Sequence, residues 1–337
     1  MPDSFLDVVT QSMNSPTAES SEGQQPNARS SAAKVAILLA TYNGERFLGE
    51  QLESFQRQHH TNWCVWASDD GSADSTPNIL KEWGAKVGIE RLHVLRGPSQ
   101  GSSKNFLSMV HNTGIQADYY AYSDQDDVWE DDKLTRAVEW LSAQPGNVPA
   151  LYCTRTRLVD EAGRELGSSE LFSRPPSFAN ALMQNITGGN TMVFNDAARQ
   201  LLLEVPATQP LVIHDWWTYI VVSAVGGAIC FDPYPSVRYR QHGANLIGMS
   251  VEGPSWSSRI RKLFTQEFRR NGDLNVAALT YLRPKFSPEA ERIFSLYAEA
   301  RQRWLVPRVL GVRRAGLYRL TRMGDLGLLA AVVMNKL

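Results

Sequence analysis

Residues 35–44 read VAILLATYNG, and this short stretch decides the fold class of the chain. Its first six residues, 35–40, are all apolar, which is typical of a strand buried on both faces of a parallel sheet. The polar turn at 41–44 is predicted to end that strand. Apolar residues then recur at helical spacing, so a helix is predicted over residues 45–58.

The same alternation of strand and helix continues downstream. Each apolar strand is followed by a polar loop and then by a helical pattern, which predicts βαβ units in an open, doubly wound α/β sheet. Sheets of this kind bind ligands beyond the carboxyl ends of their strands. The predicted strands are 63–67, 92–95 and 119–122, and the predicted helices are one opened by Thr76-Pro77 and one over 104–113.

Three polar clusters follow the predicted strands directly. They are TYNG at 41–44, SDDGS at 68–72 and SDQDD at 123–127. Because the carboxyl ends of parallel strands share one edge of a sheet, we expect the three clusters to lie together in one ligand crevice.

The second half of the chain is less regular and is expected to extend the sheet and build the acceptor side of the site. Alternating apolar residues predict short strands, and two longer periodic segments predict helices. The predicted strands are 151–159, 190–194, 229–231 and 237–240, and the predicted helices are 196–204 and 216–225.

Composition narrows the class of protein. The chain has 337 residues, 43% of them hydrophobic, and a formal net charge of −1, which gives no indication of nucleic-acid binding. Its three cysteines lie far apart, which fits reduced thiols in a cytoplasmic protein better than disulfides or a zinc site. Residues 1–33 are rich in small polar groups and are predicted to be a disordered leader without a secretory signal.

The C-terminal segment, residues 251–337, is predicted to be helical and basic. Arginines alternate with large apolar residues over 257–270 and 301–322. Basic amphipathic segments without a membrane span suggest a protein that lies on the inner face of a cell membrane. An ordinary helical pack with a solvated basic face is the equal alternative.

The SDQDD cluster carries the most specific chemistry. Asp124, Asp126 and Asp127 place three carboxylates within four residues, which repel one another unless they are solvated or neutralised by a cation. Oxygen ligands of this kind suit Mg²⁺ or Mn²⁺ shared with substrate phosphates. An acidic run is usually only a solvated loop, but its place after a buried strand favours a metal site.

The other two clusters suit a nucleoside. A carboxylate such as Asp69 or Asp70 can accept hydrogen bonds from a ribose hydroxyl or a base N–H. Thr41, Tyr42 and Asn43 offer a hydroxyl, a stacking ring and an amide. Ordinary turns built from Asp, Gly and Ser are the alternative for both clusters.

Taken together, three motifs resemble a known family. Residues 35–48 (VAILLATYNGERFL), 67–76 (ASDDGSADST) and 122–134 (YSDQDDVWEDDKL) are similar to the donor-binding half of the family 2 glycosyltransferases. The bacterial rhamnosyltransferase-like branch is the most similar. The resemblance covers residues 35–142 and continues, with more divergence, to about residue 248. It implies the GT-A (Rossmann-like) fold, an open mixed sheet flanked by helices, followed here by a C-terminal helical region.

The resemblance also implies roles for individual residues. The first motif and the SDDGS carboxylates would hold the nucleoside, and the DxD element maps onto Asp124 and Asp126, with Asp126 the direct ligand of Mg²⁺ or Mn²⁺. The late segment 238–245 would add a phosphate grip and a further metal ligand. The nucleotide-binding set is Thr41, Tyr42, Asn43, Asp69, Asp70, Asp124 and Arg240, and the metal set is Asp126, Asp124 and His242.

A catalytic base is expected beyond the DxD element. Inversion in one displacement requires a carboxylate that takes the proton of the acceptor hydroxyl. The family's base lies at the start of a helix, and Asp215 in His214-Asp215-Trp216-Trp217 matches that position; a helix cap is the structural alternative. Gly189, Trp216 and Trp217 are the predicted acceptor-binding residues, with a tight turn and core packing as alternatives.

The resemblance predicts an inverting glycosyltransferase that moves L-rhamnose from dTDP-L-rhamnose to a glycan or lipid-linked acceptor in cell-surface polysaccharide assembly. Another nucleotide sugar such as a UDP-sugar, or an inactive nucleotide- or glycan-binding scaffold, stay open as alternatives. We expect a GT-A domain over residues 34–250, divided into a nucleotide-sugar half at 34–142 and an acceptor half at 143–250.

Overall fold

The computed structural model describes residues 32–242 and 267–337. The predicted leader, apart from its last two residues, therefore lies outside the described residues, as do residues 257–266 of the basic segment predicted over 257–270. The elements in chain order are β1 (Val35–Thr41), α2 (Leu48–Gln56), β2 (Trp63–Asp69), α3 (Thr76–Val87), β3 (Leu92–Arg96), α4 (Ser102–His111), β4 (Tyr119–Ser123), β5 (Val128–Trp129), α5 (Lys133–Ser142), β6 (Ala150–Val159), β7 (Glu165–Ser168), α6 (Phe178–Ala181), η1 (Gly189–Thr191), β8 (Val193–Asn195), α7 (Asp196–Leu203), α8 (His214–Ala224), β9 (Ala228–Arg240), α10 (Glu267–Leu279), η2 (Arg283–Lys285), α11 (Pro288–Gln302), α12 (Leu305–Ala315) and α13 (Arg322–Val333).

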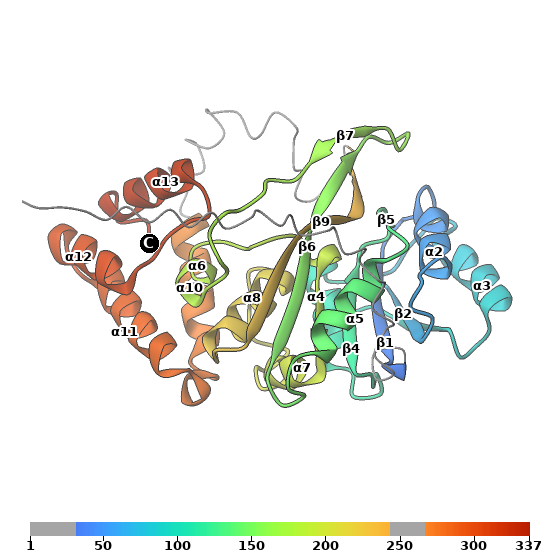
Figure 1. The fold of residues 1–337 in the computed structure, drawn as a ribbon, viewed down its shortest axis with the longest axis horizontal. Helices are drawn as coiled ribbons and strands as arrows, with labels where there is room; N and C mark the ends of the chain where they lie inside the picture. The colour runs from blue at the N-terminus through green and yellow to red at the C-terminus, as the bar shows by residue number, and fades with distance from the viewer. Residues whose placement is uncertain (1–31, 243–266) are drawn as a thin grey trace, which may run out of the picture.

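The strands form one mixed sheet in the order β3-β2-β1-β4-β8-β6-β9-β5, with β7 paired to β6 (Figure 1). The first four strands are parallel, as predicted for βαβ units. Strand β8 runs antiparallel between β4 and β6, while β6 and β9 are parallel. The sheet is thus the open mixed sheet that the sequence predicts for the GT-A fold.

Strand register brings the three polar clusters to one edge. Thr41 at the end of β1 pairs with Asp69 at the end of β2, and Leu39 pairs with Ser123 at the end of β4. Thr41, Asp69 and Ser123 belong to the three clusters, so the prediction that the clusters share one edge of the sheet is confirmed.

Alternate residues of the central strand β1 support two cores. Ile37 and Leu39 pack with α2, α3 and α5 on one face of the sheet. Leu38 and Ala36 pack on the other face with α4, α7 and α8. Every side chain of β1 is buried, which explains why the sequence shows an unbroken apolar run and no alternation.

Two local predictions differ from the structure. The strand predicted at 190–194 begins at Val193, because Gly189–Thr191 forms a 3-10 turn that lets backbone N–H groups point at a neighbouring helix. The two extended segments at 229–231 and 237–240 are parts of one long strand, β9. The strand accommodates Pro233 and Pro235, which cannot donate a ladder hydrogen bond, because the pairing of β6 with β9 shifts register there.

The C-terminal helices α10 to α13 stand at one end of the molecule, opposite α2 and α3 (Figure 1). They confirm the predicted helical C-terminal region. Leu279, Phe294 and Tyr297 belong to the same buried cluster as Tyr122 of β4 and Trp217 of α8. In the described residues, no helix combines the length and apolar character needed to cross a bilayer. The predicted domain boundaries at 142 and 250 stay predictions, and residue 250 lies outside the described residues.

Candidate active site

The carboxylates of SDQDD do not share one environment. Asp124 and Asp126 remain partly exposed at the end of β4, whereas Asp127 is 1% exposed. Asn190 Nδ2 donates to one oxygen of Asp127 at 2.5 Å, and the backbone N–H of Arg240 donates to the other at 3.3 Å. The structure therefore turns Asp127 into the interior, which differs from the prediction that all three carboxylates face a cation.

The charge of Asp124 is the least satisfied in this group. Within the described residues, no hydrogen-bond donor reaches its carboxylate. Burial, together with the nearby charges of Asp126 and Asp215, raises the pKa of Asp124 to about 8. Carboxylates from β4 and from the start of α8 therefore lie close enough to repel one another.

A buried lysine sits behind the carboxylate cluster. Lys133 is fully buried, donates from Nζ to the carbonyl of Thr191 at 3.2 Å, and lies 4.5 Å from the centre of the Trp129 ring. Burial lowers the pKa of Lys133 to about 7, and the carboxylate of Asp127 opposes that shift. The hydrogen bond to Thr191, the Trp129 ring and the nearby charge of Asp127 together offset part of the cost of burying the ammonium group.

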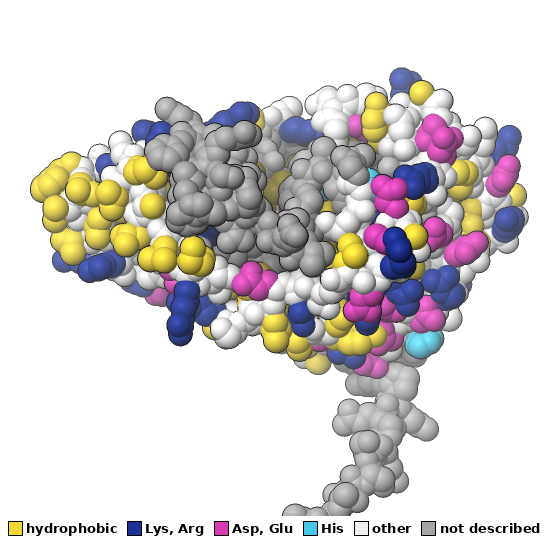
Figure 2. All heavy atoms as spheres, turned by 90° about the horizontal axis from the view of Figure 1, so that it is seen from above, with side chains coloured by type: hydrophobic (Ala, Val, Ile, Leu, Met, Phe, Trp, Pro, Cys, Tyr) yellow, Lys and Arg dark blue, Asp and Glu magenta, His cyan; other side chains and the backbone are white. Residues whose placement is uncertain are grey.

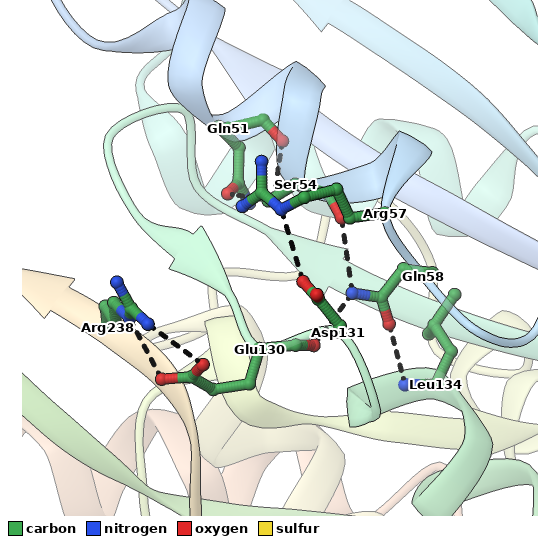
Figure 3. Close-up of polar contacts among 8 residues, drawn as sticks. All are labelled: Gln51, Ser54, Arg57, Gln58, Glu130, Asp131, Leu134 and Arg238. Carbon is green, nitrogen blue, oxygen red and sulfur yellow. Dashed lines mark hydrogen bonds and ion pairs between the residues drawn. The ribbon is translucent and has the colours of Figure 1, made fainter.

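The chain that follows the cluster is clamped to α2 and β9 (Figure 3). Gln58 donates to the carbonyl of Glu130 at 2.8 Å and accepts from the N–H of Leu134 at 3.0 Å. Arg57 donates to Asp131 at 3.2 Å, and Arg238 makes a two-pronged contact with Glu130 at 2.9 and 3.2 Å. These contacts fix the position of the loop that carries the carboxylates after β4.

Gln125 holds the first polar cluster against the third. Its amide accepts from the N–H of Tyr42 at 2.8 Å and donates to the carbonyl of Tyr42 at 2.9 Å. A Cβ on Gly44 would come within 2.2 Å of the same amide, so the close approach requires glycine at that position. No role for Gln125 is predicted from the sequence, since a glutamine between two aspartates indicates no particular chemistry.

The residues predicted to bind the nucleoside form a connected network at the ends of β1 and β2. Asp69 accepts from the hydroxyls of Thr41 at 2.9 Å and Ser72 at 2.5 Å. The side chain of Asn43 accepts from the N–H of Ala73 at 2.9 Å. The Tyr42 ring is 58% exposed and is therefore the group of this cluster that is open to a flat ligand.

Asp70 braces the loop that precedes α4. It is buried, and its two oxygens accept from the N–H groups of Ser99 at 2.6 Å and Gly101 at 2.7 Å. A Cβ on Gly97 would lie 2.7 Å from Asp70 Oδ1, so that glycine permits the contact. The structure thus assigns both Asp70 oxygens to the backbone of this chain, and its predicted contact with the nucleoside stays a prediction.

Asp215 stands in the first turn of α8 and is 5% exposed. One of its oxygens accepts from the N–H of Gly189 at 2.9 Å and the other from its neighbour, Trp216, at 2.6 Å. Burial raises the pKa of Asp215 to about 6, and the two N–H donors limit that rise. A carboxylate with a pKa near neutrality is suited to exchanging protons with a substrate.

The turn at Gly189-Asn190 joins the two carboxylate groups. Gly189 donates its N–H to Asp215, while the adjacent Asn190 donates its side-chain amide to Asp127. A Cβ on Gly189 would lie 2.7 Å from His214 Nε2, so only glycine lets the turn approach α8 this closely. The structure therefore gives Gly189 a positioning role, and its predicted contact with an acceptor stays a prediction.

The three side chains around Asp215 differ in what they can offer. Trp217 is 1% exposed and lies in the core, so of the two tryptophans predicted to contact the acceptor only Trp216 stays a candidate. Trp216 is partly buried, and its Nε1 donates to the carbonyl of Ala181 at 2.7 Å. His214 is buried against Phe106, and burial lowers the pKa of its imidazole to about 3. It is therefore neutral beside Asp215.

Arg240 and His242 come from the end of β9. The guanidinium of Arg240 is 3% exposed, and it donates to the carbonyl of Asp126 at 3.1 Å and to Glu50 at 2.7 Å. His242 Nε2 lies 2.7 Å from Asp126 Oδ2. Both residues thus contact Asp126, beside which they were predicted to bind phosphate (Arg240) and metal (His242). The hydrogen bonds of the Arg240 guanidinium go to other groups of the protein.

The oxygens of Asp124 and Asp126 are the groups best placed to hold a divalent cation. Within residues 32–242 and 267–337, no three His, Cys, Asp or Glu side chains are arranged to hold a metal ion by themselves. Two carboxylates completed by substrate phosphates and water fit Mg²⁺ chemistry, and the crowded negative charge at Asp124 fits a cation that relieves it.

Comparison with known proteins places the chain in a family. Residues 36–202 match the family model described as glycosyl transferase family 2. The chain belongs to glycosyl transferase family 2. This segment of the family 2 chain includes β1 to β4, the carboxylate cluster and the Gly189-Asn190 turn.

Two relatives extend the comparison. The family 2 chain is 27% identical over 234 residues to the Shigella flexneri protein named dTDP-rhamnosyl transferase RfbG, covering 67% of this chain and 78% of the relative. It is 28% identical over 215 residues to the uncharacterized protein Rv1520 of Mycobacterium tuberculosis, covering 63% of this chain and 60% of that protein. The family 2 chain therefore spans less than two thirds of the mycobacterial relative.

A solved structure shares the fold. Residues 1–349 of S. aureus TarS, crystallised in complex with UDP-GlcNAc, superpose with a TM-score of 0.52 at 15% identity, covering 89% of this chain and 90% of that one. At this identity the likeness concerns the fold alone. The superposition covers a larger share of the chain than the family 2 match over residues 36–202.

Proposed function

We propose that the protein is an inverting glycosyltransferase that moves a sugar from a nucleoside diphosphate sugar to a hydroxyl of a glycan or lipid-linked acceptor. The observation that carries the proposal is the meeting of two carboxylate groups across one edge of the sheet. Asp124 and Asp126 follow β4, Asp215 lies in the first turn of α8, and the Gly189-Asn190 turn contacts both Asp215 and Asp127. One group suits the donor's phosphates and the other suits an acceptor hydroxyl.

Asp215 is the proposed catalytic base. Its raised pKa of about 6 leaves it ionised at neutral pH yet basic enough to accept a proton as the new glycosidic bond forms. The N–H donors of Gly189 and Trp216 hold the carboxylate in one orientation, so it can face an incoming hydroxyl without a change of rotamer. Trp216 would border the acceptor.

Asp126 and Asp124, with His242 against Asp126, would hold Mg²⁺ or Mn²⁺. Such a cation supplies Lewis-acid stabilisation of the charge that grows on the departing nucleoside diphosphate. The residues of this chain set the place: β4 presents the carboxylates, Gln125 fixes their loop against Tyr42, and Arg240 supports the backbone at Asp126. Tyr42, Thr41, Asn43, Asp69 and Asp70 would border the nucleoside, with the exposed Tyr42 ring stacking on the base.

The donor is proposed to be dTDP-L-rhamnose. Support comes from the 27% identity to a protein named as a dTDP-rhamnosyl transferase. A UDP-sugar is the alternative, because no described contact of this site distinguishes thymine from uracil. A role in cell-surface polysaccharide assembly at the inner face of the cell membrane completes the proposal.

The test is a donor-hydrolysis screen. The purified full-length chain is incubated with dTDP-L-rhamnose, UDP-sugars and GDP-sugars, in Mn²⁺, Mg²⁺ or EDTA, and release of the nucleoside diphosphate is measured. We expect release from dTDP-L-rhamnose, dependent on the metal and lost in Asp126→Asn and Asp215→Asn. Faster release from a UDP-sugar would mean that the UDP-sugar, and not dTDP-L-rhamnose, is the donor. No release from any donor, with or without candidate acceptors, would support an inactive scaffold instead.

A further inference from the structure

Helix α13 exposes an apolar stripe that faces away from the rest of the molecule. Met323, Leu326, Leu329 and Val333 recur at helical spacing and are between 47% and 59% exposed. The opposite side of the helix, with Leu328 and Val332, is buried. An apolar helix face is normally packed against another element, whereas the described residues leave this outer stripe uncovered.

The neighbouring helix α12 enlarges the same surface. Trp304, Val306 and Leu310 at the start of α12 are 68%, 51% and 46% exposed. A groove of about 610 Å³ lies between the two helices and is lined mainly by apolar side chains, including Val309 and Val312. Figure 2 shows hydrophobic side chains gathered at this end of the molecule, bordered by Lys and Arg side chains. We call this surface, formed by α12 and α13, the helical tip.

The charge around the helical tip is mainly positive, although Arg303 pairs with Glu299 and Arg308 is buried. Between residues 303 and 337 the sequence holds seven Arg and Lys residues and one acidic residue, Asp325. Asp325 is itself paired with Arg174 at 2.7 Å. Arg313, Arg314 and Arg322 are exposed beside the apolar stripes. A second copy of the chain would bring like charges together, so the basic border favours an anionic partner.

We propose that the helical tip docks on an anionic lipid surface, with the apolar stripes of α12 and α13 entering the headgroup region and the arginines contacting lipid phosphates. Apolar area and cationic charge on one face are the two terms that hold interfacial helices on such membranes. Trp304 adds an amphipathic ring of the kind enriched at that depth. The inference deepens the membrane part of the proposed function and rests on it for its biological setting.

The tip is braced to the active-site layer, so docking would orient the whole molecule. The hydroxyl of Tyr318, in the connection between α12 and α13, donates to the carbonyl of Pro175 at 2.7 Å, and Asn180 of α6 donates to the carbonyl of Tyr318 at 3.2 Å. The next residue of α6, Ala181, accepts from Trp216 beside the proposed base. An enzyme docked through the helical tip would therefore present its active site to a lipid-linked acceptor in one orientation.

The experiment measures co-sedimentation of the full-length chain with vesicles. One set contains phosphatidylcholine alone and the other equal parts of phosphatidylcholine and phosphatidylglycerol. We expect sedimentation with the anionic vesicles, weakened by salt, and a loss of affinity of about tenfold or more in Leu326→Glu combined with Leu329→Glu. The matched control is Ile89→Glu, an equally drastic change at a residue that is 79% exposed near α3, at the other end of the molecule.

A second variant separates charge from apolar contact. Arg313→Gln combined with Arg314→Gln adds no buried group to an apolar face, so it tests the proposal even if the glutamate variant folds poorly, which circular dichroism would show. We expect it to weaken binding to anionic vesicles severalfold and to reduce the salt dependence.

Three results would overturn the inference. They are equal binding to neutral and anionic vesicles, binding unchanged in both tip variants, or a concentration-dependent dimer in the absence of lipid that Leu326→Glu converts to monomer. Donor hydrolysis is measured in lipid-free buffer with the same protein preparations, and we expect the tip variants to retain it. Failure of the proposed enzymatic function would instead appear as no hydrolysis in any sample, whatever the vesicles show.

Discussion

The two carboxylate groups of the site are built in different ways. The β4 group emerges from a regular strand, and its neighbours are fixed by contacts such as the Gln125 amide on Tyr42. The Asp215 group stands at a helix start and is fixed by an irregular turn, through the N–H of Gly189. The pKa of Asp124 in the β4 group is raised partly by neighbouring negative charges, whereas the pKa of Asp215 is set mainly by burial and two N–H donors.

This difference separates two tasks. A crowded carboxylate cluster gains most from a cation, since a positive charge removes the repulsion within it. A single buried carboxylate with a pKa of about 6 gains most from a proton, which suits acid–base work. If the comparison is correct, changes at the two groups will have different effects on the reaction, and a change in the turn between them will affect both.

The largest effect is expected for Asp215→Asn. Asparagine has nearly the same shape but cannot accept a proton, so we expect the rate of transfer to fall by about 10²- to 10⁴-fold with little change in the KM for the donor. The measurement is steady-state release of the nucleoside diphosphate. Asp273→Asn, at an exposed carboxylate of α10 that pairs with Arg301, is the matched control. A variant that keeps more than half the original rate would remove Asp215 from the mechanism.

The pH dependence gives the next largest effect. The base works as a carboxylate, so protonation of Asp215 removes activity as the pH falls. At saturating Mn²⁺, which would keep Asp124 ionised, we expect kcat/KM to be flat above about pH 7 and to fall tenfold per unit below about pH 6, since the pKa of Asp215 is about 6. Bound Mn²⁺ would move this midpoint lower, because a nearby positive charge favours the ionised form. A falling limb that persists unchanged in Asp215→Asn would have to come from another group.

The sequence predicted the β4 group better than the Asp215 group, for physical reasons. A strand buried on both faces leaves an unbroken apolar run, and the polar residues after it must lie at the sheet edge, so Thr41, Asp69 and Asp124 could be placed from pattern alone. Asp215 was placed by resemblance, because a carboxylate at a helix start is equally a cap. In the structure it accepts from Gly189 and Trp216, a combination that the sequence around it does not specify.

Long-range contacts account for what sequence reasoning missed. Asn190 reaches Asp127, 63 positions away, and Gln125 reaches Tyr42, 83 positions away. Neither spacing repeats or follows a helical or strand period, so no local pattern indicates it. The orientation of Asp127 was missed for the same reason: its partners Asn190 and Arg240 become neighbours only when β8 and β9 join the sheet.

A change at the turn tests the link between the two groups. In Asn190→Ala, the buried Asp127 carboxylate loses its side-chain donor, which we expect to cost about 1–3 kcal/mol of folding free energy. We also expect kcat to fall about tenfold, because the carboxylates on both sides lose a shared support. Thermal unfolding and turnover are measured separately. The control is Asn62→Ala, which removes an exposed side-chain hydrogen bond to the carbonyl of Ala32. Normal turnover in a destabilised Asn190→Ala would show that the turn only supports the fold.

The smallest effect is expected on the donor side, where Tyr42 offers its exposed ring. In Tyr42→Ala a nucleoside would lose a stacking partner, and because base–aromatic stacking contributes about 1–3 kcal/mol in other proteins, we expect the KM for the donor to rise about fivefold or more with kcat nearly unchanged. Tyr42→Phe keeps the ring and should keep the KM. Both variants leave the backbone atoms of Tyr42 in place, so the contact with Gln125 is retained. If Tyr42→Ala lowered kcat and left the KM alone, the ring would act on the reaction itself, and the division of tasks between the donor-binding and proton-accepting groups would fail.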